Sequence, residues 1–140
     1  MLLAIDIGNT NIVVALFHED EITHEWRIHS DPNRTADEYS SIILSFFRDN
    51  GISQSYIKSG VLSSVVPLLI GPFIRLMENI IGRKPIILGP SIYDKLPVTI
   101  PKSALHEIGT DLVANSVQAF VEYKKPCIIA DFGTALTFTA

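Results

Sequence analysis

Two short acidic segments hold the residues of this sequence that are best suited to chemistry. The first, Asp6–Asn11 (DIGNTN), follows the apolar run of residues 2–5, and the second, Asp131–Thr134 (DFGT), follows residues 127–130. A carboxylate at the end of a buried strand is costly unless it is paired or holds a cation. A nearby glycine permits a tight turn that leaves backbone N–H groups free to face an anion. Each segment therefore predicts a phosphate-binding turn, with Asp6 placed to hold Mg²⁺, and the alternative for each is an ordinary β-hairpin turn.

A third acidic residue, Asp111, lies at the start of a predicted helix in the segment Glu107–Leu112 (EIGTDL). In the first turn of a helix, the helix dipole stabilises an ionised carboxylate. An ionised Asp beside a bound hydroxyl group accepts its proton as phosphoryl transfer proceeds. The alternative is a helix-start acid without chemistry. The four histidines are dispersed and show no metal-ligand spacing, so we interpret them as surface residues.

The hydrophobic pattern predicts strands and helices that would position these residues. Thr35 and Glu38 match a capping box at a helix start, and Gly51 and Gly82 follow predicted helices. Three antiparallel strands followed by alternating helices and strands predict an α/β fold with a mixed sheet flanked by helices. Residues 89–106 are expected to be mostly loop. The expected strands are residues 2–5, 12–17, 22–28, 60–66, 85–88, 127–130 (a buried strand) and 135–139, and the expected helices are residues 35–51, 68–81 and 108–123.

Composition excludes several classes of protein. The 140 residues carry a net charge of −4, and the basic residues are scattered, so we expect no nucleic-acid partner. No apolar run is long enough to span a bilayer, so we expect no membrane partner, and the single Cys127 suits a reducing cytoplasm. Residues 128–140 read as two strands with no cap after them, which would leave an open sheet edge. We therefore expect the chain to be a fragment of a longer protein.

Taken in order, these segments resemble type III pantothenate kinases, bacterial enzymes that phosphorylate pantothenate in the first step of coenzyme A biosynthesis. The resemblance rests on Asp6–Asn11, Ser63–Pro67 (SSVVP), Glu107–Asp111 and Asp131–Thr137 (DFGTALT). It implies the ribonuclease-H-like (actin-like ATPase) fold of the acetate kinase/hexokinase/actin superfamily, with a mixed five-stranded sheet. Residues 1–130 would form the N-terminal subdomain, and residues 131–140 would begin the second one.

The resemblance also implies the site residues and the ligands. ATP, Mg²⁺, a monovalent cation (K⁺ or NH₄⁺) and pantothenate would bind to a cytoplasmic homodimer. Asp111 would accept the substrate proton, and Asp6 and Asp131 would hold the metal ions, with Asp131 on the monovalent cation. The ATP-binding residues would be Asp6, Ile7, Gly8, Asn9, Thr10, Asn11, Ile12, Val13 and Thr134. The pantothenate-binding residues would be Lys102, Gly109, Thr110, Asp111 and Leu112.

Three positions depart from the family pattern. Leu112 stands where the family usually has Arg, residues 102–105 replace a Tyr-x-Asn-Pro segment, and Leu136 replaces a Thr. Leu112 cannot donate to a substrate carboxylate as a guanidinium group would. These departures leave two alternatives: a non-catalytic nucleotide-binding paralogue similar to the Bvg accessory factor regulators, or a kinase of the same superfamily that acts on another small hydroxy acid. We expect the 140 residues alone to be inactive.

Overall fold

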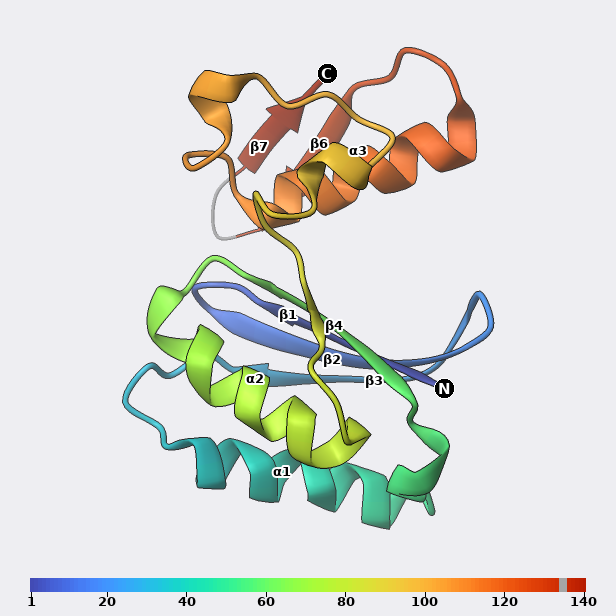
Figure 1. Ribbon diagram of the computed structural model, residues 1–140, viewed down its shortest axis with the longest axis vertical. Coiled ribbons are helices and arrows are strands. Elements are labelled where there is room, and N and C mark those ends of the chain that lie inside the picture. The colour runs from blue at the N-terminus through green and yellow to red at the C-terminus, as the bar shows by residue number, and fades with distance from the viewer. Residues whose placement is uncertain (134–135) are drawn as a thin grey trace. The chain divides into compact units, whose positions relative to one another are not determined.

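The computed structural model describes residues 1–133 and 136–140, which divide into two compact units, Met1–Ile87 and Leu88–Ala140 (Figure 1). The predicted subdomain boundary after residue 130 refers to the longer protein and stays a prediction.

The first unit contains one mixed sheet with the strand order β3-β2-β1-β4-β5. β1 pairs antiparallel with β2 and β2 with β3, whereas β4 runs parallel to β1 and β5 parallel to β4. The predicted α/β fold, with three antiparallel strands followed by parallel ones, is therefore confirmed. The strands are β1 (Leu2–Ile7), β2 (Asn11–His18), β3 (Glu21–His29), β4 (Ser59–Ser64) and β5 (Ile86–Ile87).

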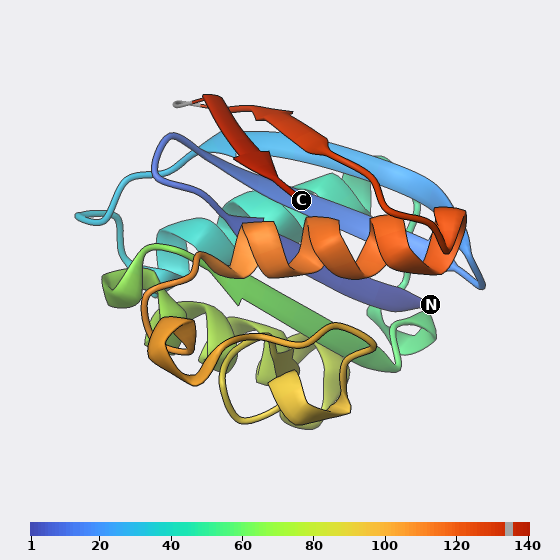
Figure 2. The ribbon, with the colours of Figure 1, turned by 90° about the horizontal axis from the view of Figure 1, so that it is seen from above.

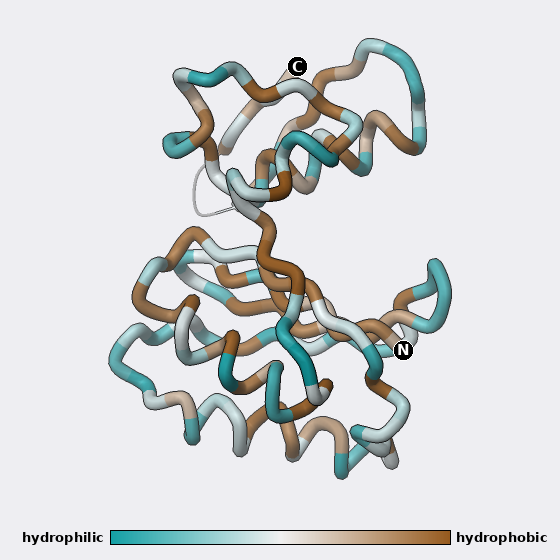
Figure 3. Tube along the Cα trace, viewed as in Figure 1, coloured by the Kyte–Doolittle hydropathy of each residue, from teal (hydrophilic) through white to brown (hydrophobic). Residues whose placement is uncertain are grey.

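Two helices, α1 (Ala36–Asp49) and α2 (Pro67–Ile81), cover one face of this sheet (Figure 1). Because side chains alternate between the two faces of a strand, every second residue points toward the helices, and nearly all of these residues are apolar in β1 and β2. The β1 and β2 segments are mostly hydrophobic, while the β2–β3 turn is hydrophilic (Figure 3). Burial of these side chains is the main stabilising contribution to the unit. The fully buried core includes Leu3, Ile5, Ile7, Ile12, Val14, Leu16, Tyr39, Ile43, Leu62, Phe73 and Met77.

The ends of the two helices follow the local sequence. The predicted capping box is confirmed, because the Thr35 N–H donates to Glu38 Oε2 at 2.7 Å and the Glu38 N–H donates to Thr35 Oγ1 at 3.3 Å. α2 begins with Pro67, one residue before the predicted start, and Gly82 is its C-cap, as predicted. It packs closely on β4 at Gly60, where an added Cβ atom would lie 2.7 Å from Met77 Cε. A side chain at this position would force the helix or the methionine to move.

The second unit contains one long helix, α3 (Thr110–Tyr123), and the antiparallel hairpin of β6 (Ile129–Phe132) and β7 (Leu136–Thr139). Figures 1 and 2 both show α3 beside this hairpin. The residues before α3 form loop with two short 3₁₀ turns, η2 (Tyr93–Lys95) and η3 (Lys102–Ala104), which agrees with the predicted loop. In the part of the chain that the structure describes, no helix has the length and apolar character needed to cross a membrane.

The prediction of a buried strand at residues 127–130 is wrong. The strand begins only at Ile129, Cys127 is exposed, and Ile128 is 76% exposed. A strand is buried on both faces only where layers of structure cover both of them. Here β6 pairs with β7 alone among the described strands, and Ala130 and Phe132 on one face are exposed.

Candidate functional site

The turn between β1 and β2 is closed by its own backbone. The Gly8 N–H donates to the Asn11 carbonyl oxygen at 2.9 Å. The prediction that backbone N–H groups of this turn are free to face an anion is therefore wrong for Gly8, because its N–H closes the hairpin. An added Cβ atom at Gly8 would lie 3.1 Å from the same Asn11 oxygen, which explains the need for glycine here. The exposed residues Asn9 and Thr10 form the tip of the turn.

Asp6 lies within β1 and not in the turn that follows it. Its register partners are Val13 on β2 and Ser63 on β4. Since Ile5 and Ile7 point into the core, the exposed Asp6 carboxylate lies on the sheet face opposite the two helices. The site is thus a carboxylate beside a hydroxyl group at the carboxyl ends of two parallel strands, where α/β sheets bind ligands.

Ser63 belongs to the Ser63–Pro67 segment, which the sequence suggested could line a cleft, but no ligand was predicted for it. The signal available in the sequence was its position at the end of a predicted strand, but the strand order that brings it beside Asp6 was needed as well. The side chains of Ile7 and Ile12, predicted to contact ATP, are fully buried in the core. Only their backbone atoms could meet a ligand. Val13 is half-buried on the same face as Asp6.

In the second unit, α3 holds Asp111 in its first turn, as predicted. Gly109 is the N-cap residue and supplies no side-chain cap. One carboxylate oxygen, Asp111 Oδ1, accepts the Leu112 N–H at 2.9 Å, which fixes the orientation of the group. The side chain is half-buried. Thr110 and Leu112 on either side are also half-buried.

Asp131 lies on β6 and is held by α3. The Asn115 side-chain amide donates from Nδ2 to Asp131 Oδ2 at 2.8 Å. Asn115 follows Asp111 by four residues, so the two side chains lie on the same face of the helix, about one turn apart. One face of α3 therefore carries the predicted proton acceptor and the contact to the predicted cation ligand. Asn115 was missed, although its spacing from Asp111 was visible in the sequence.

The remaining predicted site residues are Lys102 and Thr134. Lys102 lies exposed on η3, and no described hydrogen bond or ion pair joins it to Asp111. Thr134 falls outside the described residues. Within residues 1–133 and 136–140, no group of three or more His, Cys, Asp or Glu side chains is arranged to hold a metal ion. A cation at Asp131 would therefore require amide or carbonyl oxygens, or ligand oxygens, to complete its coordination.

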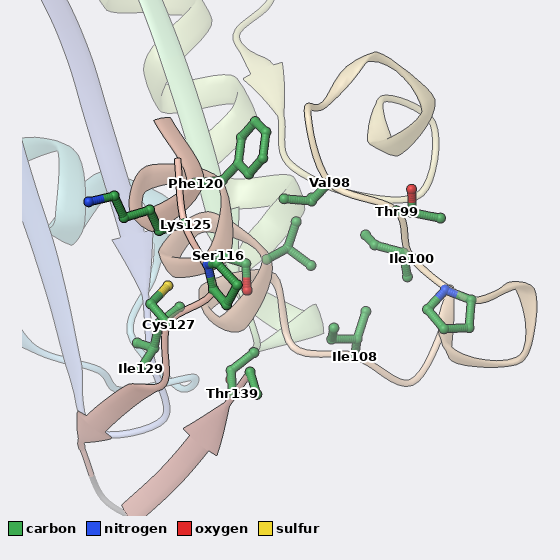
Figure 4. A pocket seen from close by; sticks show the side chains of 14 residues that line it. Val98, Thr99, Ile100, Ile108, Ser116, Phe120, Lys125, Cys127, Ile129 and Thr139 are labelled. Carbon is green, nitrogen blue, oxygen red and sulfur yellow. The ribbon is translucent and has the colours of Figure 1, made fainter. Parts of the chain in front are cut away.

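The second unit also contains a cavity of about 350 Å³ (Figure 4). Its lining is mostly apolar and comes from the loop of residues 98–101, from α3 and from the hairpin. Ser116 is one polar member, and its Oγ donates to the Leu112 carbonyl oxygen at 2.8 Å. Neither Asp111 nor Asp131 lines this cavity. The apolar lining does not suit a phosphate group, so the carboxylates and the cavity are separate features.

Comparison with known proteins identifies similar sequences over the whole chain. The family model for type III pantothenate kinase matches residues 2–140. A type III pantothenate kinase of Brevibacillus brevis is 41% identical over 138 residues, and that of Geobacter sulfurreducens is 39% identical over 138 residues. Each alignment covers 99% of this chain and 53% of the relative. The chain thus spans about half the length of the curated relatives that it matches.

Proposed function

The chain belongs to the type III pantothenate kinase family, and from that membership we propose that the whole protein transfers the γ-phosphoryl group of ATP to the primary hydroxyl group of pantothenate. The product, 4′-phosphopantothenate, would enter coenzyme A biosynthesis. The observation that carries the proposal is the orientation of Asp111, with one oxygen fixed by the Leu112 N–H.

Asp111 is the proposed proton acceptor. The pantothenate hydroxyl oxygen would form a bond to the γ-phosphorus while the bond from that phosphorus to the ADP oxygen breaks, and the hydroxyl proton would pass to Asp111. Phosphoryl transfer requires mainly positioning and charge stabilisation from the protein, so a carboxylate with one oxygen held in place is suited to this task. Gly109, Thr110, Leu112 and Lys102 are the other proposed pantothenate-binding residues.

The first unit supplies the proposed ATP and Mg²⁺ residues. The exposed Asp6 carboxylate and the neighbouring Ser63 hydroxyl group are the oxygen ligands that Mg²⁺ prefers. The turn at Gly8–Thr10, followed by Asn11 to Val13, would meet the phosphates. Bound Mg²⁺ would neutralise charge that develops on the phosphates. Thr134 is also proposed to contact ATP, as the family resemblance implies.

Asp131 is proposed to bind the monovalent cation, K⁺ or NH₄⁺. The Asn115 amide donates to Asp131 Oδ2 at 2.8 Å, and Oδ1 is the oxygen that we propose as the cation ligand. A homodimer in the cytoplasm is proposed from the family resemblance, and the free, exposed Cys127 is compatible with a reducing compartment. The 140 residues alone are proposed to be inactive, because they span about half of the relatives.

The experiment that tests the function measures ADP formation by the full-length protein with and without pantothenate. We expect ADP formation to depend on pantothenate and Asp111→Asn to lower kcat by about 10²-fold or more, since the proton loses its acceptor. Glu122→Gln, which changes an exposed acid at the other end of α3, is the matched control and should retain activity. Equal turnover of Asp111→Asn and the wild-type protein would remove Asp111 from the mechanism.

Leu112 favours a second candidate function. A leucine side chain offers no hydrogen-bond donor beside Asp111, so a non-catalytic paralogue that binds nucleotide as a regulator is the alternative. Calorimetry with MgATP and with pantothenate, each titrated alone, separates the two. Binding of MgATP without pantothenate binding or turnover would support the regulator. ATP consumption stimulated by a different hydroxy acid would instead indicate a kinase with another substrate.

A further inference from the structure

The loop that follows β3 forms a hydrogen bond to the nucleotide turn, which is the proposed ATP-binding turn of residues 8–10. The Ser30 N–H donates to the Thr10 carbonyl oxygen at 2.9 Å, directly beyond the last register pair of β2 and β3, Asn11 and His29. Ser30 is only 4% exposed. The tip of the turn therefore receives a hydrogen bond from a buried backbone group, and its position depends on how firmly the loop at Ser30 is fixed.

Tyr39 fixes this loop. Its hydroxyl group accepts the Asp31 N–H at 2.8 Å and donates to the Asp31 carbonyl oxygen at 2.9 Å, so it satisfies both backbone groups of the residue after Ser30. The tyrosine ring is fully buried and packs against the Phe73 ring of α2, with the centroids 4.9 Å apart. The hydroxyl group is thus held in place by the core of the first unit.

The Ser30 side chain contributes nothing comparable. Its Oγ is buried and has no hydrogen-bond partner among the described residues. An unpartnered buried hydroxyl group does not stabilise a loop. What fixes Ser30 is therefore its neighbour Asp31, through both hydrogen bonds to Tyr39.

We infer that Tyr39 is a positioning residue for the nucleotide turn, acting from its hydroxyl group through the Asp31 backbone and the Ser30 N–H to the Thr10 carbonyl oxygen. The role for ATP rests on the proposed function, whereas the hold on the turn rests on the hydrogen bonds alone. Removing the hydroxyl group leaves the Asp31 N–H without this partner, while the Asp31 carbonyl oxygen keeps only the Arg34 N–H at 3.1 Å. The loop then rearranges so that water can reach the N–H. The turn then occupies its binding geometry for a smaller fraction of the time, and the apparent affinity for ATP falls by that fraction.

The test compares Tyr39→Phe with two matched controls in the full-length protein. Ile43→Val alters the same buried face of α1 one turn later without touching the loop, and Ser30→Ala removes the unpartnered hydroxyl group but keeps the N–H. For Tyr39→Phe we expect the KM for MgATP to rise about tenfold with kcat and the KM for pantothenate little changed. Both controls should retain the wild-type KM for MgATP.

Hydrogen exchange measured by mass spectrometry provides a readout that needs no turnover. Tyr39→Phe should speed amide exchange in segments 7–11 and 29–32, and Ile43→Val should not. Unchanged exchange in these segments would overturn the inference. If the wild-type protein neither binds nor consumes MgATP, the proposed function fails, and the exchange comparison still decides whether Tyr39 holds the turn. If the wild-type protein is active and Tyr39→Phe matches it in both readouts, only the inference about Tyr39 fails.

Discussion

Asn115 joins Asp131 to the face of α3 that carries Asp111. It donates to Asp131 at 2.8 Å and lies one helical turn after Asp111. A hydrogen bond from an amide orients a carboxylate and leaves its other oxygen for a ligand, which is how residues behind a metal ligand tune affinity. Asn115 therefore bears on the proposed cation site without itself taking part in the chemistry.

Asn115→Ala should weaken activation by K⁺. We expect the K⁺ concentration for half-maximal activity to rise about 10-fold or more, because Asp131 loses the donor that orients it. The measurement is ADP formation by the full-length protein across a K⁺ titration at saturating ATP and pantothenate. Gln118→Ala, an exposed change on the same helix, is the control for altered helix stability. An unchanged K⁺ requirement in Asn115→Ala would contradict the assignment of Asp131.

The start of α1 combines the capping box with an acid whose protonation weakens the cap. The Thr35 backbone N–H and then the Thr35 hydroxyl group, both donating to Glu38 Oε2, hold the pKa of Glu38 below its ordinary value of 4.5. A folded-state pKa below the unfolded one means that the folded state binds fewer protons. The resulting stability is present above pH 4.5 and is lost as the pH falls through the lower, folded-state pKa.

Glu38→Gln should therefore flatten the acid side of the pH–stability profile. Glutamine keeps a carbonyl oxygen for the Thr35 N–H but has no proton to gain. Urea unfolding followed by circular dichroism between about pH 6 and pH 3 should show a smaller loss of stability for Glu38→Gln than for the wild-type chain. Asp20→Asn, which changes an exposed acid in the β2–β3 turn, serves as the control. Parallel profiles for Glu38→Gln and the wild-type chain would exclude the capping box as the source of this pH dependence.

Local chemistry made most of the elements of the first unit predictable from the sequence. The cap at Thr35, the helix end at Gly82 and the alternation along β1 depend only on residues that are close in the sequence. Helix ends and strand faces could therefore be predicted from the sequence alone. The exposure of residues 127–130 could not be predicted, because an apolar run does not indicate how many layers of structure cover it.

The candidate site divides in the same way. Asp6 and Asp111 were predicted from their positions at a strand end and at a helix start, both of which are local features. Ser63 beside Asp6 required the strand order, and the Asn115–Asp131 contact required the packing of α3 against β6. Tyr39 lies in a predicted helix, but its hydrogen bonds to Asp31 depend on the path of a loop and could not be predicted.

The two units differ greatly in how much core they contain. The main buried cluster lies entirely between Leu3 and Ile80, within the first unit. Among the described residues of the second unit, the buried apolar ones are Tyr93 and Val113, while Phe120, Phe132 and Phe138 are exposed by 48%, 81% and 68%. Since burial of apolar surface drives folding, nearly all of this stabilisation resides in the first unit.

Residues 1–87 should consequently fold on their own. We expect this segment to unfold in urea in one cooperative transition, with a midpoint near that of the 140-residue chain, because the segment contains the whole main core. Trp26, the only tryptophan of the chain, stacks on Phe46 of α1 and reports the transition by fluorescence. Phe73→Ala, which removes a fully buried ring from that core, should cost about 3–5 kcal/mol in both the segment and the whole chain. A broad, non-cooperative transition of residues 1–87 would mean that this core depends on residues 88–140 to form.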